Sequence, residues 1–183
     1  MKNQMMNHKC HLHTPIGTVC IEADEEAITA LYFDREYKQK YDLAKAGDGA
    51  AESAGQKEAF NETVFLEKPE TDLLQKAGNQ LIEYFQGKRK VFDLPLKPSG
   101  TEFQKKVWKA LCSIPYGQTR SYGEIAEQIG NPRACRAIGG ANNKNPVMIF
   151  IPCHRVIGAD GSLVGFGGGL YAKKYMLDLE RGK

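Results

Sequence analysis

A chain of 183 residues, with 42% hydrophobic and 26% charged residues, is long enough to bury one large core or two small ones. No apolar run reaches the length that crosses a bilayer, and residues 1–13 lack the apolar stretch of a signal peptide. Together with five irregularly spaced cysteines, which argue against a disulfide framework, this predicts a cytoplasmic protein without a membrane partner.

The net charge of +3 is divided unevenly along the chain. Residues 101–183 carry 12 basic and 6 acidic side chains, whereas residues 1–100 carry 13 basic and 16 acidic ones. A basic C-terminal half suits a polyanionic partner. An ordinary solvated surface explains the same charge equally well.

The first half is predicted to form strands followed by a helix. Residues 18–23 and 27–33 are short β-rich runs, and residues 91–94 form a third. Apolar residues recur at helical spacing over residues 72–86, and Gly87 provides the stop signal. This half therefore resembles a small α/β scaffold, and it contains no recognisable catalytic set.

Two segments without periodicity divide the chain. Residues 44–57 are rich in Gly, Ala, Ser and charge, which predicts a flexible surface loop. Residues 95–100 contain Pro, Ser and Gly and are predicted to be a linker. We therefore expect one domain over residues 1–96 and a second over residues 97–183.

The second half begins with strong helix signals. Residues 101–104 and 121–124 are both capping boxes, each opening an apolar periodic run. Gly130 ends the second run, after which Asn131 is expected to cap the next helix and Pro132 to occupy its first position. Two short helices joined by a tight turn predict a helix-turn-helix motif.

The second helix of this motif has an unusual composition. Small residues surround Arg136, and four of them are Ala134, Ala137, Gly140 and Ala141. Such a surface fits tight packing against a neighbouring helix or contact with a nucleic-acid groove. Arg136 favours the groove slightly, because a long cation on a smooth helix can reach into a duplex.

A candidate nucleophile follows the longest apolar run. Residues 147–151 are predicted to form a buried strand that ends at Pro152, and Cys153, His154 and Arg155 come next. Nearby cations stabilise a thiolate, which is the nucleophilic form of cysteine. Without further context, a small buried packing thiol is the favoured explanation of the Cys-His pair.

The six residues 151–156, Ile-Pro-Cys-His-Arg-Val, resemble the active-site signature of the O6-alkylguanine-DNA alkyltransferases. The similarity extends in order over essentially all of residues 100–181, whereas the N-terminal half is similar only through residues 14–17 and its strand and helix pattern. The resemblance implies an α/β ribonuclease-H-like N-terminal domain and a mainly α, winged-helix-like C-terminal domain with a helix-turn-helix. Outside the signature the matching residues are Ser121-Tyr122, Asn131-Pro132, Arg136-Ala-Ile-Gly-Gly-Ala141, Asn145-Pro146, Gly168-Gly-Leu170 and Leu179-Glu180.

The resemblance also implies DNA repair in a single turnover, in which the alkyl group of O6-alkylguanine is transferred to Cys153. His154 would act as the base through a water molecule, with Glu180 polarising it. Tyr122 would donate a proton or hydrogen bond to the departing O6, and Asn145 would brace the active-site turn. Activity on O4-alkylthymine is left open.

The expected partner is double-stranded DNA, bound by a monomer through the minor groove. In the family, the helix-turn-helix enters that groove, which fits the small surface of Ala134, Ala137, Gly140 and Ala141. Arg136 would occupy the space left by the flipped nucleotide.

The lesion would be held in a pocket whose expected members are Met148, Val156, Phe166 and Gly167. Phe166 stands where the family usually has tyrosine, so a hydroxyl contact is lost while stacking survives. Lys173 and Lys174 are expected either to contact phosphate or to solvate the last helix.

No metal and no cofactor are predicted. Some relatives carry a structural zinc in the N-terminal half, but the ligand pattern here does not clearly match. The local candidates are His8, Cys10, His11, His13 and Cys20.

Three other functions compete with alkyl transfer. A non-catalytic relative that only binds the lesion would lack the nucleophile, and Cys153 is present. A regulator with an alkylation-sensing domain needs more chain than 183 residues provide. A cysteine hydrolase needs an orienting residue and an oxyanion hole, neither of which is evident.

Overall fold

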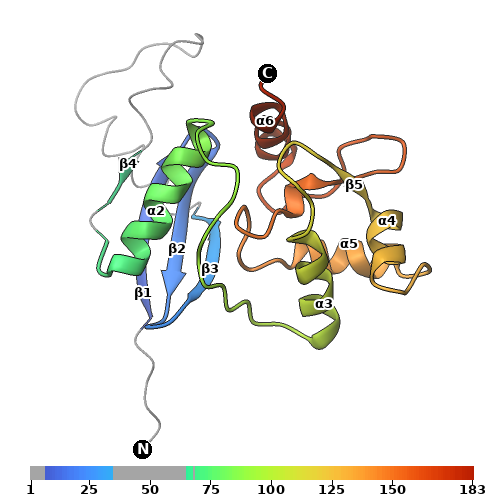
Figure 1. Ribbon diagram of the computed structural model, residues 1–183, viewed down its shortest axis with the longest axis horizontal. Helices are drawn as coiled ribbons and strands as arrows, with labels where there is room; N and C mark the ends of the chain where they lie inside the picture. The colour runs from blue at the N-terminus through green and yellow to red at the C-terminus, as the bar shows by residue number, and fades with distance from the viewer. Residues whose placement is uncertain (1–6, 35–64, 68) are drawn as a thin grey trace, which may run out of the picture.

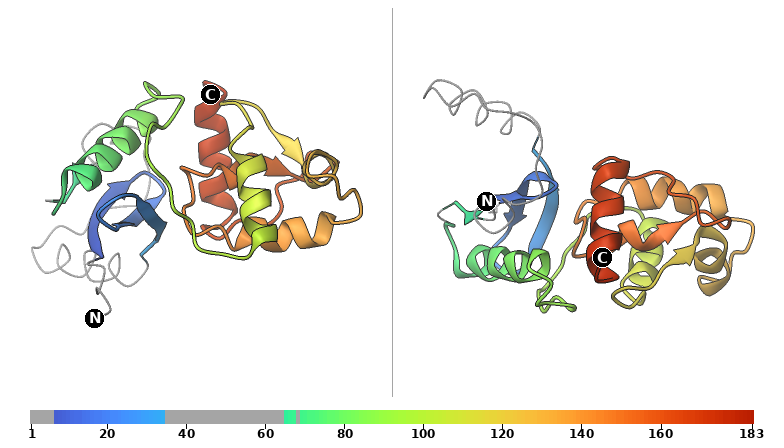
Figure 2. Two further views of the ribbon diagram at one scale, coloured as in Figure 1. Left: turned by 60° about the horizontal axis from the view of Figure 1, so that its bottom comes forward. Right: turned by 90° about the horizontal axis from the view of Figure 1, so that it is seen from above.

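The computed structural model describes residues 7–34, 65–67 and 69–183, and the predicted loop over residues 44–57 lies outside them. Two bodies lie side by side (Figure 1): a small sheet covered by a helix, and a group of helices formed by the second half of the chain. Figure 2 shows the same separation from two further directions. The predicted organisation, an α/β part followed by a mainly α part, is confirmed.

The N-terminal sheet has the strand order β3-β2-β1-β4, with every pair antiparallel. Its strands are β1 (His8–Thr14), β2 (Gly17–Ala23), β3 (Ile28–Phe33) and β4 (Phe65–Leu66). The helix α2 (Asp72–Phe85) lies across one face of the sheet (Figure 1) and buries apolar side chains against it. The prediction of strands at residues 18–23 and 27–33, and of the helix, is therefore confirmed.

The strand predicted at residues 91–94 is wrong. Val91 is 75% exposed, and the chain pairs with the sheet only later, where Leu96 forms a single bridge to Ile28. The backbone N–H of Ile28 donates to the carbonyl of Pro95 (2.9 Å), and that of Lys97 donates to the carbonyl of Ile28 (2.9 Å). The apolar residues before Leu96 thus belong to the connection between the two bodies.

The helical body contains α3 (Glu102–Leu111), α4 (Tyr122–Gln128), α5 (Cys135–Asn143) and α6 (Leu170–Glu180). The short strands β5 (Arg120–Ser121) and β6 (Val156–Ile157) pair in parallel, and a single 3₁₀ turn, η1, spans Cys153–Arg155. Both predicted capping boxes are formed, at the start of α3 and of α4.

The predicted start of the second motif helix is wrong. Helix α5 begins at Cys135 after Ala134, which makes no side-chain cap. A separate turn precedes it, in which the backbone N–H of Ala134 donates to the carbonyl of Asn131 (3.0 Å). Pro132 lies within this turn, so its fixed φ serves the turn and not the helix.

Residues 147–151 form a buried turn where a strand was predicted. Val147 makes one bridge to Leu31 of β3, and the chain then reverses, with the N–H of Ile151 donating to the carbonyl of Val147 (3.0 Å). Ile149 has a φ of 74°, a left-handed conformation that is costly for a β-branched residue. The apolar run is therefore buried, but it forms a tight turn that packs against the N-terminal sheet and does not form a strand.

Within the described residues, no helix is both long and apolar enough to span a membrane.

Lys173 is fully buried, so neither predicted role applies to it. Its ammonium donates to the carbonyl oxygens of Val156 (2.6 Å), Val164 (2.7 Å) and Gly165 (3.4 Å). Burial lowers the pKa of Lys173 to about 8. One side chain of α6 thereby anchors the loop over residues 164–165 to the segment that follows Cys153.

We expect Lys173→Met to destabilise the protein by about 2–4 kcal/mol, because it removes the donor from the buried carbonyl of Val156 and the bonds that hold Val164 and Gly165. Urea unfolding measures the change. The matched control is Lys174→Met: Lys174 is exposed and pairs with Asp178 on the surface, so the change should stay within about 0.5 kcal/mol. Equal losses in the two variants would contradict the anchoring role.

Candidate active site

Cys153 lies directly after the buried turn and is only 3% exposed. Asn145 closes that turn with both ends of its amide. Its Nδ2 donates to the carbonyl of Ile151 (2.8 Å), and its Oδ1 accepts from the N–H of Val147 (3.0 Å). Burial raises the pKa of the Cys153 thiol, and the proximity of the Asn145 side chain lowers it in part. The bracing role expected of Asn145 thus has a direct geometric basis.

The thiol of Cys153 is protonated at rest. Burial raises its pKa to about 11, and the hydrogen bond from Asn145 and the charge of Lys173 offset this only in part. The sequence suggested that the adjacent His154 and Arg155 stabilise a thiolate, but both side chains are directed at Glu180 instead. A nucleophile in this environment therefore needs a base that removes its proton.

His154 has the geometry of such a base. It is fully buried, and its Nε2 lies 2.8 Å from Oε1 of Glu180. Because an ionised carboxylate only accepts, Nε2 carries the ring proton and Nδ1 is left as an acceptor. Nδ1 has no hydrogen-bond partner among the described residues. Burial lowers the pKa of His154 even though Glu180 opposes this, so the ring is neutral at rest.

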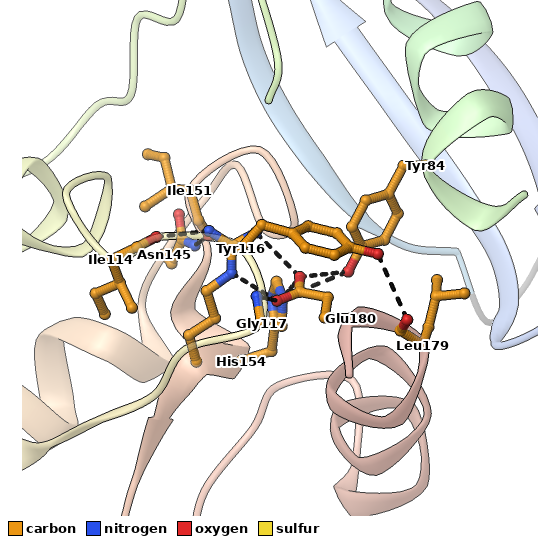
Figure 3. A network of polar contacts seen from close by, with 10 residues as sticks. Tyr84, Ile114, Tyr116, Gly117, Asn145, Ile151, His154, Leu179 and Glu180 are labelled. Carbon is orange, nitrogen blue, oxygen red and sulfur yellow. Dashed lines mark hydrogen bonds and ion pairs between the residues drawn. The ribbon is translucent and has the colours of Figure 1, made fainter. Parts of the chain in front are cut away.

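Glu180, the last residue of α6, collects several donors (Figure 3). Arg155 binds both of its oxygens, with Nε 2.9 Å from Oε2 and Nη2 3.0 Å from Oε1, and its Nη1 donates to the carbonyl of Ile114 (2.7 Å). Burial raises the pKa of Glu180, but the hydrogen bond to His154 and the hydrogen bonds and charge of Arg155 outweigh it and lower the pKa to about 2. The carboxylate therefore stays ionised.

Glu180 has two further hydrogen-bond donors that the sequence pattern does not predict. The hydroxyl of Tyr84, on α2, donates to Oε1 (2.8 Å), and the backbone N–H of Gly117 donates to Oε2 (3.0 Å). Tyr84 occupies an apolar position in the helical pattern of α2, and Gly117 belongs to an ordinary turn motif. No local signal in the sequence distinguishes either residue, since the contacts join separate parts of the chain.

Tyr122 is half-buried at the start of α4, and its hydroxyl donates to the carbonyl of Val164 (3.2 Å). Burial and the proximity of Cys153 raise the pKa of Tyr122, so it remains a donor. The four expected pocket residues come from the same region: Val156 is buried, Met148 and Phe166 are half-buried, and Gly167 is exposed. A Cβ on Gly167 would lie 4.0 Å from Cε of Met148, which places those two side by side.

The small residues of the motif divide between two faces. Arg136, Ala137 and Gly140 are exposed on α5. Ala134 and Ala141 are buried, at 8% and 3% exposure, and the carbonyl of Ala141 accepts from the indole N–H of Trp108 on α3 (2.9 Å). Both interpretations of this composition therefore apply, each to different residues: internal packing for Ala134 and Ala141, and an open surface around Arg136.

Among the residues that the structure describes, no group of three or more His, Cys, Asp or Glu side chains is arranged to hold a metal ion. All five cysteines are free thiols.

Comparison with known proteins identifies both halves of the chain. Residues 8–98 match the ribonuclease-like domain of 6-O-methylguanine DNA methyltransferase, and residues 102–182 match the DNA-binding domain of the same family. A methylated-DNA–protein-cysteine methyltransferase of Methanosarcina acetivorans is 46% identical over 91% of this chain and 94% of its own. The constitutive methyltransferase of that name from Bacillus subtilis is 42% identical over 96% of each chain.

Solved structures agree. The O6-methylguanine methyltransferase of Mycobacterium tuberculosis superposes with a TM-score of 0.74, at 40% identity, over 97% of this chain and 94% of its own. A complex of Mycobacterium tuberculosis OGT with DNA gives a TM-score of 0.73 at 39% identity, over 94% of this chain and 91% of the other. The expected combination of a ribonuclease-like domain with a DNA-binding domain is confirmed.

The ion pairs of Glu180 predict a specific acid sensitivity. Its folded-state pKa of about 2 lies below the ordinary value of 4.5, so its stabilising effect is complete above pH 4.5 and is lost as the pH falls towards 2. We expect the melting temperature of the wild type to fall more steeply over this interval than that of Glu180→Gln, as measured by calorimetry. Glu127→Gln, an exposed position on α4, serves as control and should follow the wild type. Parallel curves for all three proteins would contradict the assignment.

Proposed function

This chain belongs to the methylated-DNA–protein-cysteine methyltransferase family, and on that basis we propose that Cys153 is the residue that takes the alkyl group from O6-alkylguanine in DNA. The observation that carries the assignment is a buried, protonated thiol followed in the chain by a neutral His154 that is hydrogen-bonded to an ionised Glu180. Cys112 and Cys135, by contrast, are exposed and have no comparable partners.

The chemistry follows from these groups. The Sγ of Cys153 forms a bond to the alkyl carbon as the bond from that carbon to O6 breaks. The thiol proton passes through a bridging water to Nδ1 of His154, the ring nitrogen that remains an acceptor. The guanine product gains one proton, so the net reaction exchanges an alkyl group for a proton. The thioether left on Cys153 cannot ionise, and the protein therefore acts once.

Tyr122 is placed to assist the leaving group. Its hydroxyl donates to the carbonyl of Val164. Besides burial, the nearby Cys153 helps to raise the pKa of Tyr122, which supports a place for Tyr122 in the same site. We assign it the hydrogen bond, or proton, that the departing O6 needs. Glu180 keeps the ring proton of His154 on Nε2 and stabilises the charge that the ring acquires.

DNA is expected to contact the exposed face of α5. Arg136, Ala137 and Gly140 form an open, nearly smooth surface from which a single cation projects. Because both Ala134 and Ala141 are buried, we restrict the contact surface to the exposed residues. A shallow face of this kind suits the minor groove, and Arg136 is suited to fill the position of the flipped nucleotide.

We assign the flipped base to the space bordered by Met148, Val156, Phe166 and Gly167. Phe166 offers an aromatic face for stacking and no hydroxyl for a hydrogen bond. Lys173 donates to the carbonyls of Val164 and Gly165 as well as to that of Val156, which joins the start of this loop to the segment after Cys153.

The setting of the reaction is part of the proposal. We place the protein in the cytoplasm as a monomer, because a free nucleophilic thiol persists in a reducing compartment and each molecule carries one complete site. We also propose domain boundaries at residues 1–96 and 97–183, since the connection between α2 and α3 passes from one body to the other there.

The alternative, lesion binding without repair, is not favoured. A protein that only bound the lesion would need neither the thiol nor the base, and here Cys153 and His154 are both present and buried together.

The assignment of Cys153 predicts a stoichiometric outcome. With excess duplex DNA containing O6-methylguanine, we expect one methyl group per protein, located by mass spectrometry on the peptide that carries Cys153. Cys153→Ser should transfer none, and Cys112→Ser and Cys135→Ser should match the wild type. Continued turnover, or methyl on another cysteine, would exclude the mechanism.

The role of Arg136 predicts a difference between substrates. Flipping a base costs a few kcal/mol, so we expect Arg136→Ala to slow repair of duplex DNA by roughly ten- to hundredfold. Reaction with free O6-benzylguanine should change by less than about twofold, because no base is flipped. Arg133→Ala, at an exposed neighbouring arginine, is the control and should show the smaller effect on duplex DNA. Equal losses on both substrates would refute the extrusion role.

A further inference from the structure

We propose that Tyr84 is a positioning residue for alkyl transfer: its hydroxyl holds the Glu180 carboxylate in the orientation that keeps the proton of His154 on Nε2. The inference rests on the function proposed above and adds to it a residue from the N-terminal body. It assigns that body a direct part in the reaction site, beyond support of the fold.

Tyr84 and His154 share one hydrogen-bond acceptor, Oε1 of Glu180. Oε1 of Glu180 accepts from the hydroxyl of Tyr84 at 2.8 Å and lies 2.8 Å from Nε2 of His154. The tyrosine oxygen itself is 3.5 Å from Nε2, so the two donors approach one oxygen from neighbouring directions (Figure 3). Both Tyr84 and His154 are fully buried, which strengthens hydrogen bonds to a charged acceptor.

Tyr84 is held rigidly in this position. Its ring packs against Phe92, with centroids 5.4 Å apart, and meets Tyr116 edge-on at 6.2 Å. Burial, followed by the charge and hydrogen bond of Glu180, raises the pKa of Tyr84 well above its ordinary value, so the hydroxyl always has a proton to donate. Since α2 belongs to the N-terminal body and Glu180 ends α6, this hydrogen bond joins the two bodies at the site.

The bond matters for chemistry because donors on one oxygen compete. Each hydrogen bond accepted by Oε1 withdraws negative charge that would otherwise stabilise a protonated His154. Without the hydroxyl of Tyr84, the carboxylate attracts a second proton onto the imidazole more strongly. A doubly protonated ring has no acceptor for the thiol proton of Cys153. Arg155 keeps Glu180 ionised and in place with or without the hydroxyl of Tyr84. Loss of the hydroxyl therefore changes how strongly Glu180 favours the protonated form of His154.

The test uses the full chain and the conservative variant Tyr84→Phe, which keeps the ring and removes only the hydroxyl. Single-turnover methyl transfer from an O6-methylguanine duplex is followed across pH at saturating protein, so that DNA affinity does not enter. The matched control is Tyr116→Phe. Tyr116 packs against Tyr84 at the same boundary, but its hydroxyl donates to the backbone carbonyl of Leu179 (3.5 Å).

We expect Tyr84→Phe to lower the plateau rate by roughly three- to tenfold, and to move the midpoint of the acidic limb upward by about half a pH unit. Tyr116→Phe should leave the midpoint where it is in the wild type. A purely structural loss would lower stability in both variants without moving the midpoint. An unchanged profile in Tyr84→Phe would overturn the proposal.

A spectroscopic measurement is independent of activity. The chain has only four histidines, so ¹⁵N labelling of the imidazoles gives a simple spectrum. We expect His154 to carry its proton on Nε2 in the wild type, and its titration to move to higher pH in Tyr84→Phe while the other three stay constant. The Nδ1-protonated form in the wild type would overturn the proposal even if the variant failed to fold.

The experiments distinguish the proposed function of Cys153 from the proposed role of Tyr84. If the wild type transfers no methyl to Cys153, the proposed function is wrong. If the wild type is active and Tyr84→Phe matches it in rate, pH profile and ¹⁵N shifts, the function stands and the role of Tyr84 is rejected.

Discussion

A buried carboxylate, that of Glu180, is the constraint on which the rest of the site depends. Removing a charge from water is costly unless charged partners and hydrogen bonds replace the solvent. Here Arg155, His154, Tyr84 and the backbone of Gly117 supply them from separate elements. Because every one of these donors must be in place, the end of α6, the segment after the nucleophile and the helix α2 are fixed relative to one another.

The same convergence explains how a resting thiol can be both protected and reactive. Burial keeps Cys153 protonated, which suits the single use proposed for this thiol as a nucleophile. His154 is kept neutral by burial and oriented by Glu180, so the proposed base is in place before a substrate binds. The turn before the thiol is strained, because Ile149 adopts a left-handed conformation there. The side chain of Asn145 stabilises this turn by hydrogen bonds.

Local sequence was informative wherever the deciding interactions are local. The capping boxes that begin at Thr101 and Ser121 formed as predicted, because each satisfies its helix end within four residues. The signature around Cys153 and His154 pointed to the family that the comparisons confirm. The strands predicted at residues 91–94 and 147–151 were wrong because apolar content does not predict the path of the backbone. The cap predicted at Asn131 was wrong because a separate turn precedes α5.

By itself, the sequence determined the family and the two-part organisation, and it singled out Cys153 and His154 as the proposed reactive pair. Tertiary structure alone decided which groups meet. Tyr84 and Glu180 are 96 positions apart, and Tyr84 occupies an apolar position in a helical repeat, so no spacing rule connects them. Likewise, Lys173 and Lys174 are chemically alike in the sequence, yet the phase of α6 buries the first among carbonyls and leaves the second in water. Such outcomes depend on how separate elements pack, and packing is a property of the whole chain.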